Sequence, residues 1–380
     1  MTRRTMIDIH ILQTVPPSNL NRDDTGSPKT AVYGGVRRAR VSSQAWKRAT
    51  RAEFAHLLDR TDLGVRTKRL GEALAERIRA ANPDLTGQAT ELADTAMTAT
   101  KIKMKAPAKP KKGEPAPEGG VESEYLVFLS HQQLDAIAEA TIAAHRRGES
   151  PDTATLKNLA NQRHSIDIAL FGRMLADLAD INVDAAVQVA HAISVHAVDN
   201  EFDYYTAVDD RKNDAGEQGA GMIGTVEFNS ATLYRYATLN VNQLHETLGD
   251  AQATCRAVSA FLAAFVRSMP TGKQNTFANR TLPDAVLVRL RDTQPINLVG
   301  AFEDACVTTS TSGRLAQAAE RLATHTKAVE DAYQETPVAA WTCLVGEHTQ
   351  PLAALGTPMR IGELIAAVTE QVGDRLGATG

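Results

Sequence analysis

The chain has 380 residues, of which 43% are hydrophobic and 23% charged, and its formal net charge is -4. This composition is typical of a globular protein with one large domain that carries insertions, or with two domains. Three widely spaced cysteines favour neither a disulfide framework nor a zinc site, and no stretch reaches the length of a membrane span. Asp8 and His10 interrupt the apolar run near the N-terminus, so we expect no signal peptide and a cytoplasmic protein.

The first predicted element is a strand over residues 5–15. Ile7, Ile9 and Ile11 lie on one side of it, and the pattern ends at two consecutive prolines. A strand that leads into a glycine-rich loop and a helix is consistent with the first βα unit of a ferredoxin-like, RRM-like fold, although many other α/β units begin in the same way. We therefore predict an α+β protein with one face of this strand buried.

Residues 25–52 contain no Asp or Glu, although the whole chain is acidic. Ser42 and Ser43 are N-cap candidates for a helix that runs to about Leu58, and Gln44 shares a polar face of that helix with several cations. Cations in the first turns of a helix oppose its macrodipole, which favours a site for an anion such as phosphate over a solvated basic face. The seven cations of this acid-free segment are Lys29, Arg37, Arg38, Arg40, Lys47, Arg48 and Arg51.

The next hundred residues have mainly helical periodicity, including helices predicted over 131–147 and 152–163. Residues 101–120 alternate lysine with alanine and proline, so they cannot form a core, and we expect a loop inside an inserted helical subdomain. A lysine-rich loop can contact polyanions non-specifically, and a solvated loop without that role is equally consistent with the pattern.

A strand is predicted where Ile166, Ile168 and Leu170 alternate, and it ends in an apolar corner at 171–174. Residues 184–198 have the periodicity of an amphipathic helix.

An acidic run follows this predicted helix over residues 199–210. Together with His191 and His196 it has the residue types of a metal-dependent nuclease site. The spacing matches no motif of known geometry, and we therefore predict no metal.

Two glycine-containing motifs resemble nucleotide-binding signatures. Gly219–Gly224 satisfies the pattern GxGxxG, but the residues after it predict strands instead of the helix that a dinucleotide site requires. The loop at 269–277 lacks the first glycine of a Walker A motif, so we expect no nucleotide cofactor. Its glycine, lysine and two amides suit a sugar-phosphate backbone better.

Five blocks of sequence, in one order, carry a family resemblance. They are LNRDD with GGVRRARVSSQAWKRA at positions 20–24 and 34–49, IDIALFGRM at 166–174, VAHAISVHAVDNEFDYYTAVDD at 189–210, GTVEFNSATLYRYATLNV at 224–241 and MPTGKQNTF at 269–277. The chain resembles the CasC-like, crRNA-binding backbone subunit of type I-E CRISPR Cascade, a member of the repeat-associated RNA-binding (RAMP) superfamily.

The resemblance implies an α+β fold with a ferredoxin-like (RRM-like) core, a helical insertion and a thumb-like hairpin around 165–183. Residues 1–60 and 163–300 would form the palm, residues 61–162 the fingers, and residues 301–380 a helical part packed on the palm. The implied function is non-catalytic: several copies, typically a hexameric row, bind the guide RNA and leave its bases free to pair with the target DNA strand. Other Cascade subunits are the further implied partners.

We predict that the RNA is bound through the acid-free segment, its flanks, the thumb-like hairpin and the loop at 269–277. The alternative is a metal-independent endonuclease that processes CRISPR repeat RNA, for which His10 is the single candidate base. The predicted RNA-binding residues are Asn21, Arg22, Lys29, Arg37, Arg38, Arg40, Ser42, Ser43, Gln44, Lys47, Arg48, Arg51, Phe171, Arg173, Met174, Lys273, Gln274 and Asn275.

Overall fold

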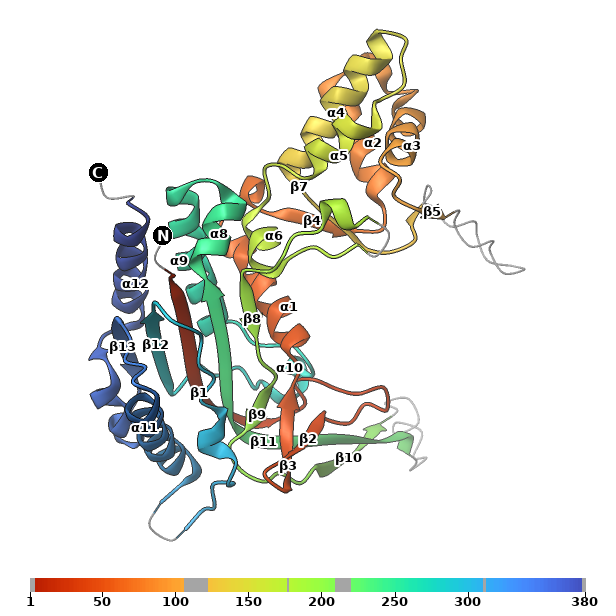
Figure 1. Ribbon diagram of the computed structural model, residues 1–380. Helices are drawn as coiled ribbons and strands as arrows, with labels where there is room; N and C mark the ends of the chain where they lie inside the picture. Colours follow the sequence, from red (N-terminus) through yellow and green to blue (C-terminus); the bar gives the residue numbers. More distant parts are fainter. Residues whose placement is uncertain (1–3, 106–121, 176–177, 209–219, 310–311, 378–380) are drawn as a thin grey trace. The chain divides into compact units, whose positions relative to one another are not determined.

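The computed structural model describes residues 4–105, 122–175, 178–208, 220–309 and 312–377 (Figure 1). The chain divides into two compact units. Unit 1 comprises Met1–Glu53, Gln188–Val241 and Val258–Gly380, and unit 2 comprises Phe54–Val187 and Asn242–Ala257. None of the helices within the described ranges has the length and apolar character that a membrane span requires.

A 10-stranded sheet is the framework of unit 1. Its main path has the order β14-β13-β12-β1-β11-β9-β3-β2, and β8 and β10 also pair with β11. Strand β1 is central, because it pairs antiparallel with β11 on one side and with β12 on the other. The strands are β1 (Met6–Ser18), β2 (Thr30–Tyr33), β3 (Val36–Val41), β8 (Val187–Val189), β9 (Ala192–Ser194), β10 (Glu201–Val208), β11 (Ala220–Asn240), β12 (Ala285–Arg291), β13 (Ala339–Leu344) and β14 (Thr357–Pro358).

The strand predicted at residues 5–15 is confirmed as β1, but both of its faces are buried. Leu12 belongs to a core cluster formed with helix α11 (Arg314–Tyr333), and Val15 belongs to a second cluster that contains Trp46. Helical segments therefore cover both sides of the sheet at β1. The strand also continues through the two prolines to Ser18, with an irregular register after Val15, because proline has no N–H to donate to the ladder.

The helices of unit 1 pack on this sheet. Trp46 of α1 is buried, and its ring lies 3.7 Å from the guanidinium carbon of Arg235, a residue of β11. The same guanidinium lies 4.6 Å from the ring of Phe265 in α9, so one arginine joins both helices to the sheet. The helices of this unit are α1 (Ser43–Glu53), the part of α9 (Ala251–Arg267) from Val258 onward, α10 (Gln274–Phe277), α11 (Arg314–Tyr333) and α12 (Ile361–Leu376). All of α8 (Val241–Leu248) except Val241 belongs to unit 2.

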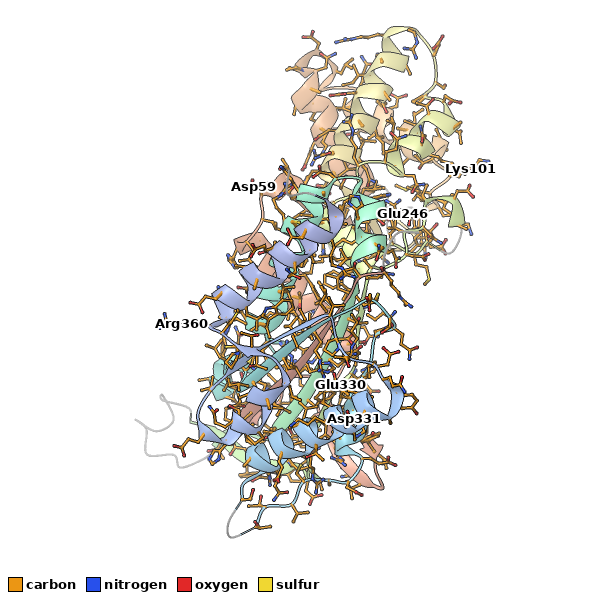
Figure 2. The ribbon with its side chains drawn as sticks, turned by 60° about the vertical axis from the view of Figure 1, so that its left-hand side comes forward. Asp59, Lys101, Glu246, Glu330, Asp331 and Arg360 are labelled. Carbon is orange, nitrogen blue, oxygen red and sulfur yellow. The ribbon has the colours of Figure 1, made fainter. Side chains whose placement is uncertain are left out.

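The C-terminal residues contribute strands as well as helices. Strand β13 extends the sheet beyond β12, a position that the helical pattern of this region did not predict. On α11, Glu330 pairs with the buried Arg289 of β12, whereas the neighbouring Asp331 is exposed (Figure 2). This ion pair joins α11 to the sheet.

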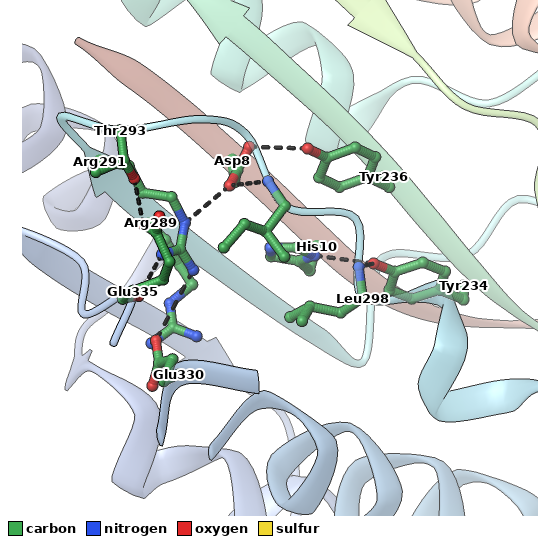
Figure 3. Close-up of polar contacts among 11 residues, drawn as sticks. Asp8, His10, Tyr234, Tyr236, Arg289, Arg291, Thr293, Leu298, Glu330 and Glu335 are labelled. Carbon is green, nitrogen blue, oxygen red and sulfur yellow. Dashed lines mark hydrogen bonds and ion pairs between the residues drawn. The ribbon is translucent and has the colours of Figure 1, made fainter. Parts of the chain in front are cut away.

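A polar network lies inside unit 1 beside β1 (Figure 3). The Asp8 carboxylate is 3.0 Å from Nε of Arg291, and it accepts hydrogen bonds from the Tyr236 hydroxyl at 2.9 Å and the Ile296 N–H at 3.0 Å. Burial raises the pKa of Asp8, and these three donors oppose that rise. The interior of the sheet therefore holds charge that is balanced at fixed positions.

Within the described residues, unit 2 is a helical subdomain with two small two-stranded antiparallel sheets. Ser130 and Gln133 form a capping box at the start of α4, with both hydrogen bonds at 2.9 Å, and α4 and α5 confirm the helices predicted over 131–147 and 152–163. The core of the unit is apolar and draws on all four long helices. Its elements are β4 (Gly64–Thr67), α2 (Leu70–Ala81), α3 (Ala89–Ala99), β5 (Met104–Lys105), β6 (Glu122–Ser123), β7 (Val127–Ser130), α4 (His131–Arg146), α5 (Thr153–Ala160) and α6 (Ile166–Phe171).

Two of the predicted elements are wrong. Residues 166–171 form helix α6 instead of a strand, and Ile166–Leu170 are all buried, so their apparent alternation did not mark an exposed face. The helix ends at Phe171, and the next residue, Gly172, has a φ of 78° that favours glycine. Residues 187–189 and 192–194 form strands β8 and β9 instead of an amphipathic helix, because they add to the sheet beside β11 and β3.

Candidate nucleic-acid interface

A groove of about 920 Å³ opens on unit 1 where three segments meet. One wall is the loop after β1, the second is the start and exposed face of α1, and the third is the loop before α10. We refer to it as the loop–helix groove. It is lined by Leu20, Asn21, Arg22, Asp23, Asp24, Thr25, Gly26, Ser42, Gln44, Ala45, Arg48, Ala49, Ala52, Pro270, Thr271, Gly272 and Lys273.

The first wall is held by a turn that Asp23 organises. The Asp23 carboxylate accepts hydrogen bonds from the Thr25 N–H at 2.9 Å, the Thr25 hydroxyl at 2.7 Å and the Ser27 N–H at 3.0 Å. These donors, the Thr25 hydroxyl foremost, lower the pKa of Asp23. The turn is therefore fixed locally, with Asp24 between its anchor residues.

The second wall begins at the cap of α1. The Ser42 hydroxyl accepts the Ala45 N–H at 3.2 Å, which confirms Ser42 as the N-cap, and the Asn21 side-chain oxygen accepts the Ser42 N–H at 2.9 Å. The first bond starts the helix and the second ties it to the loop of the first wall. Helix α1 ends at Glu53, earlier than the predicted end near Leu58.

The third wall depends on a close backbone approach at Gly272. A Cβ atom at this position would lie 2.4 Å from the carbonyl oxygen of Leu20 and 2.5 Å from that of Asn19, so a larger residue would push the two loops apart. Lys273 follows with a φ of 50° and starts α10. Glycine here allows Lys273 to stand beside the loop of the first wall.

A second group of predicted residues gathers beside the groove, around the ring of His191. The His191 Nδ1 accepts the Ser43 N–H at 3.2 Å and lies 3.4 Å from Nη1 of Arg40. Burial lowers the pKa of His191, and Arg40 and Lys29 lower it further. The neutral imidazole therefore links the basic strand β3 to the start of α1.

The family of the chain follows from its sequence. The model of the family described as CT1975-like protein matches residues 7–367. The chain belongs to this family. Two solved structures are also similar over 95% of this chain and 99% of theirs. One, "CRISPR RNA-guided surveillance complex, pre-nicking", has 35% sequence identity and a TM-score of 0.77, and the other, "CRISPR RNA-guided surveillance complex", has 31% and 0.69. No curated protein sequence matches significantly. The resemblance to CRISPR surveillance-complex subunits is confirmed.

The structure brings together six of the predicted residues of this family member at the loop–helix groove. The six are Asn21, Arg22, Ser42, Gln44, Arg48 and Lys273. Lys47 and Arg51 are half-buried on α1, and burial lowers the pKa of Lys47. Arg37 is exposed on β3, Gln274 and Asn275 are exposed on α10, and none of these three lines the groove.

The prediction that Arg38 binds RNA is corrected here, because the residue is not on the surface. Its side chain is fully buried, and its guanidinium donates hydrogen bonds to the carbonyl oxygens of Tyr33, Ser194, Phe302 and Glu303 at 2.9–3.1 Å. A Cβ at Gly34 would lie 1.6 Å from the Glu303 oxygen, so glycine permits this packing. Four of its five N–H donors are engaged by carbonyl groups and the side chain is buried, so the guanidinium is not available to a phosphate.

The prediction that Arg173 in unit 2 binds RNA is corrected for the same reason. It is buried and donates hydrogen bonds to the carbonyl oxygens of Ile181 at 2.7 Å, Ala160 at 3.0 Å and Phe128 at 3.2 Å. Burial lowers its pKa to about 10. The arginine therefore holds unit 2 together and does not present its charge to a ligand.

The two apolar residues predicted beside Arg173 differ in exposure. Phe171 is half-buried and stacks on Phe54 with the ring centres 5.9 Å apart. Met174 is 86% exposed. Of the two, Met174 is the one whose side chain is mostly exposed.

His10, the candidate base of the endonuclease alternative, is inside the sheet (Figure 3). It is 1% exposed, its Nδ1 lies 2.9 Å from the Tyr234 hydroxyl, and its ring stacks on Tyr236 at 5.1 Å. Burial lowers its pKa well below the ordinary value, with Arg289 and Arg291 adding to the effect. A histidine in this position does not reach a phosphate bound in the groove.

Within the described residues, the structure supports neither a metal-dependent nuclease site nor a dinucleotide site, the two other sites considered from the sequence. Among the described residues, no group of three or more His, Cys, Asp or Glu side chains could hold a metal ion. Strand β11 begins at Ala220 and continues to Asn240, so the predicted strand after the GxGxxG pattern is confirmed. Gly219, Asp209 and Asp210 lie outside the described residues.

Exposed aromatic side chains on β10 were missed by sequence reasoning. Phe202 is 68% exposed and Tyr204 65% exposed, and both pair with β11, opposite Glu227 and Thr225. The alternation of aromatic and acidic residues is a strand pattern that could have predicted these exposed aromatic side chains. Sequence reasoning considered only the acidic residues of this run.

Proposed function

We propose that this protein is a non-catalytic RNA-binding subunit that polymerises along the spacer of a CRISPR guide RNA in a type I-E Cascade surveillance complex. In this role it presents the guide for base pairing with target DNA in antiviral defence. The loop–helix groove carries the proposal, because it gathers three cations, an N-cap serine and two amides that lie up to about 250 residues apart in the sequence.

The lining of the groove suits a sugar-phosphate backbone. Arg22, Arg48 and Lys273 supply positive charge, and Asn21, Gln44 and Ser42 supply groups that can form hydrogen bonds with phosphate or sugar oxygens. No aromatic side chain lines the groove among the described residues. A groove of this kind grips the strand independently of sequence and leaves base edges free, as a guide-presenting subunit requires.

The partners of the proposed role follow from the similar structures, which are described as RNA-guided surveillance complexes. We propose a guide crRNA, other Cascade subunits, further copies of this chain in a row that is typically hexameric, and the target DNA strand as partners, and the cytoplasm as the location. Met174, with its exposed thioether side chain, is our candidate for the residue of the thumb-like hairpin that wedges between bases.

We further propose that the core of the palm is ferredoxin-like. Strands β12, β1, β11 and β9 lie side by side in that order and pair antiparallel, with α1 following β1 and α9 following β11. A ferredoxin-like fold has its fourth, first, third and second strands in this order, with two crossover helices. The palm, fingers, thumb and C-terminal boundaries predicted from the sequence remain part of the proposal.

The proposed absence of catalysis rests on the burial of His10. General acid–base cleavage of RNA needs a base within hydrogen-bond reach of the reacting hydroxyl, and His10 instead contacts two tyrosines inside the sheet. Cleavage of repeat RNA that His10→Ala abolishes would overturn this part of the proposal.

The test is the affinity of the full chain for a spacer-length single-stranded RNA as a function of salt, with the integrity of the RNA checked on a gel. We expect log K to fall linearly with log[salt], with a slope of about 0.7 per neutralised phosphate over on the order of four contacts per copy, and the RNA to stay intact. Negligible or salt-independent affinity would contradict the proposal.

A further inference from the structure

The loop–helix groove contains two carboxylates among its cations, and their situations differ. Asp23 accepts three hydrogen bonds within its own turn, all of them at Oδ1, so this carboxylate is held by the turn that it organises. Asp24 is exposed, lines the groove, and makes no hydrogen bond or ion pair within the described part of the chain. Because the turn is anchored on both sides of it, Asp24 is held at the groove by a fixed backbone and not by a mobile loop.

A carboxylate in a groove for nucleic acid is informative, because it can only accept hydrogen bonds and it repels phosphate. Nucleic acids offer two kinds of donor to such a group: amino groups on base edges and the 2′-hydroxyl of ribose. Base amino groups change with sequence, whereas every ribonucleotide carries a 2′-hydroxyl. A subunit that accepts any spacer sequence therefore benefits from the second donor only.

The cations of the same groove favour this assignment. Arg22, Arg48 and Lys273 line it together with Asp24, so a strand whose phosphates they bind brings its sugars past the carboxylate. A deoxyribose at that position would leave the carboxylate with no donor and with phosphates nearby.

We propose that Asp24 accepts a hydrogen bond from a ribose 2′-hydroxyl and so makes the groove select RNA over DNA. This inference rests on the proposed function, since it concerns the strand bound in the same groove. It adds a determinant of specificity to cations that by themselves bind either nucleic acid.

The experiment compares three labelled ligands of one spacer-length sequence: RNA, DNA, and RNA with 2′-O-methyl riboses, which keep the oxygen but lose the donor. Binding to the full chain is measured by fluorescence anisotropy over a series of salt concentrations, and the three ligands are compared at equal salt. We expect the wild-type chain to bind RNA about tenfold more tightly than either other ligand, as one hydrogen bond to a charged acceptor allows.

The variants are Asp24→Ala, Asp24→Asn and the control Asp304→Ala. Asp304 is exposed in unit 1 and does not line the groove, so its replacement changes the net charge alone. We expect Asp24→Ala to bring the affinity ratio of RNA to DNA to about one and Asp24→Asn to keep part of the preference, because its amide oxygen still accepts. Asp304→Ala is expected to leave the ratio unchanged.

Two results would overturn the inference. One is a wild-type chain that binds RNA and DNA alike, and the other is an unchanged ratio in Asp24→Ala. In both cases a salt-dependent affinity for RNA would still support the proposed function, whereas the loss of all salt-dependent binding would contradict both proposals. Circular dichroism of each variant separates these results from misfolding, and Asp24→Asn, which preserves shape, decides the matter if Asp24→Ala does not fold.

Discussion

Arg48 and Arg291 are the same kind of residue in two opposite surroundings. Arg48 is exposed on the wall of the loop–helix groove, whereas Arg291 in β12 is 1% exposed and its Nε lies 3.0 Å from the carboxylate of Asp8. The charge of Arg48 is available to a ligand, but that of Arg291 is balanced inside the fold. Arginines at the groove are therefore expected to set RNA affinity, and those in the interior to set stability.

An exposed arginine and a buried arginine are adjacent in sequence on β3. Arg37 is exposed on β3, and Arg38 is fully buried against four carbonyl groups. Along a strand, neighbouring side chains point to opposite faces, so one residue of the pair faces solvent and the other the interior. A run of basic residues therefore does not identify which of its members binds.

The largest effect is expected for Arg291→Met, which leaves the Asp8 carboxylate buried without its charge partner. We expect the free energy of unfolding to fall by about 3–5 kcal/mol in urea denaturation. The double variant Asp8→Asn with Arg291→Met removes both charges and is expected to recover part of the loss. If Arg291→Met is as stable as the wild type, the proposed distinction between interior arginines and groove arginines is wrong.

The second effect compares Arg38→Ala with Arg37→Ala. Removal of Arg38 leaves several buried carbonyl oxygens without donors, so we expect the free energy of unfolding to fall by about 3 kcal/mol. Arg37→Ala is expected to stay within about 0.5 kcal/mol of the wild type, because its side chain is exposed. Equal stability of the two variants would show that the assignment of Arg38 to the interior is wrong.

A third effect concerns pH. His196 is buried, its Nε2 accepts the Thr232 N–H at 3.1 Å, and burial lowers its pKa to about 4 from the ordinary 6.5. The unfolded chain therefore binds a proton that the folded chain does not, and stability falls as the pH falls from 6.5 toward 4.

For His196 alone this loss amounts to about 2 kcal/mol at pH 5. We expect urea denaturation of His196→Gln to show a shallower pH dependence over this range, because glutamine can accept the same N–H without titrating. An identical pH profile in wild type and variant would contradict the role of His196.

The smallest change in the free energy of unfolding is expected for substitutions in the groove itself. Replacing Arg22, Arg48 and Lys273 by glutamine should leave stability within about 0.5 kcal/mol, lower RNA affinity about tenfold and reduce the salt slope by about 2. The same change at three exposed cations that do not line the groove, Arg4, Lys327 and Arg360, is the matched control. If the salt slope of the control falls as much as that of the groove variant, the groove cations contribute no more to RNA binding than other surface cations do.

Local patterns alone predicted several features of this protein correctly. The alternation of Ile7, Ile9 and Ile11 predicted β1, and Ser42 followed by a helical period predicted the start of α1. The ordered blocks of motifs predicted the resemblance to CRISPR surveillance-complex subunits, which the comparisons confirm. Each of these depends on neighbours along the chain, where period, capping chemistry and order can be read directly.

Tertiary structure decided which residues meet and which of them face solvent. Lys273 reaches the groove only because Gly272 lets its loop approach Leu20, about 250 residues earlier. Arg38 and Arg173 were predicted to bind RNA but are buried, because carbonyl groups from distant segments surround them. Basic composition is a property of the sequence, but the exposure of each guanidinium depends on segments that fold against it, and no local pattern contains that information.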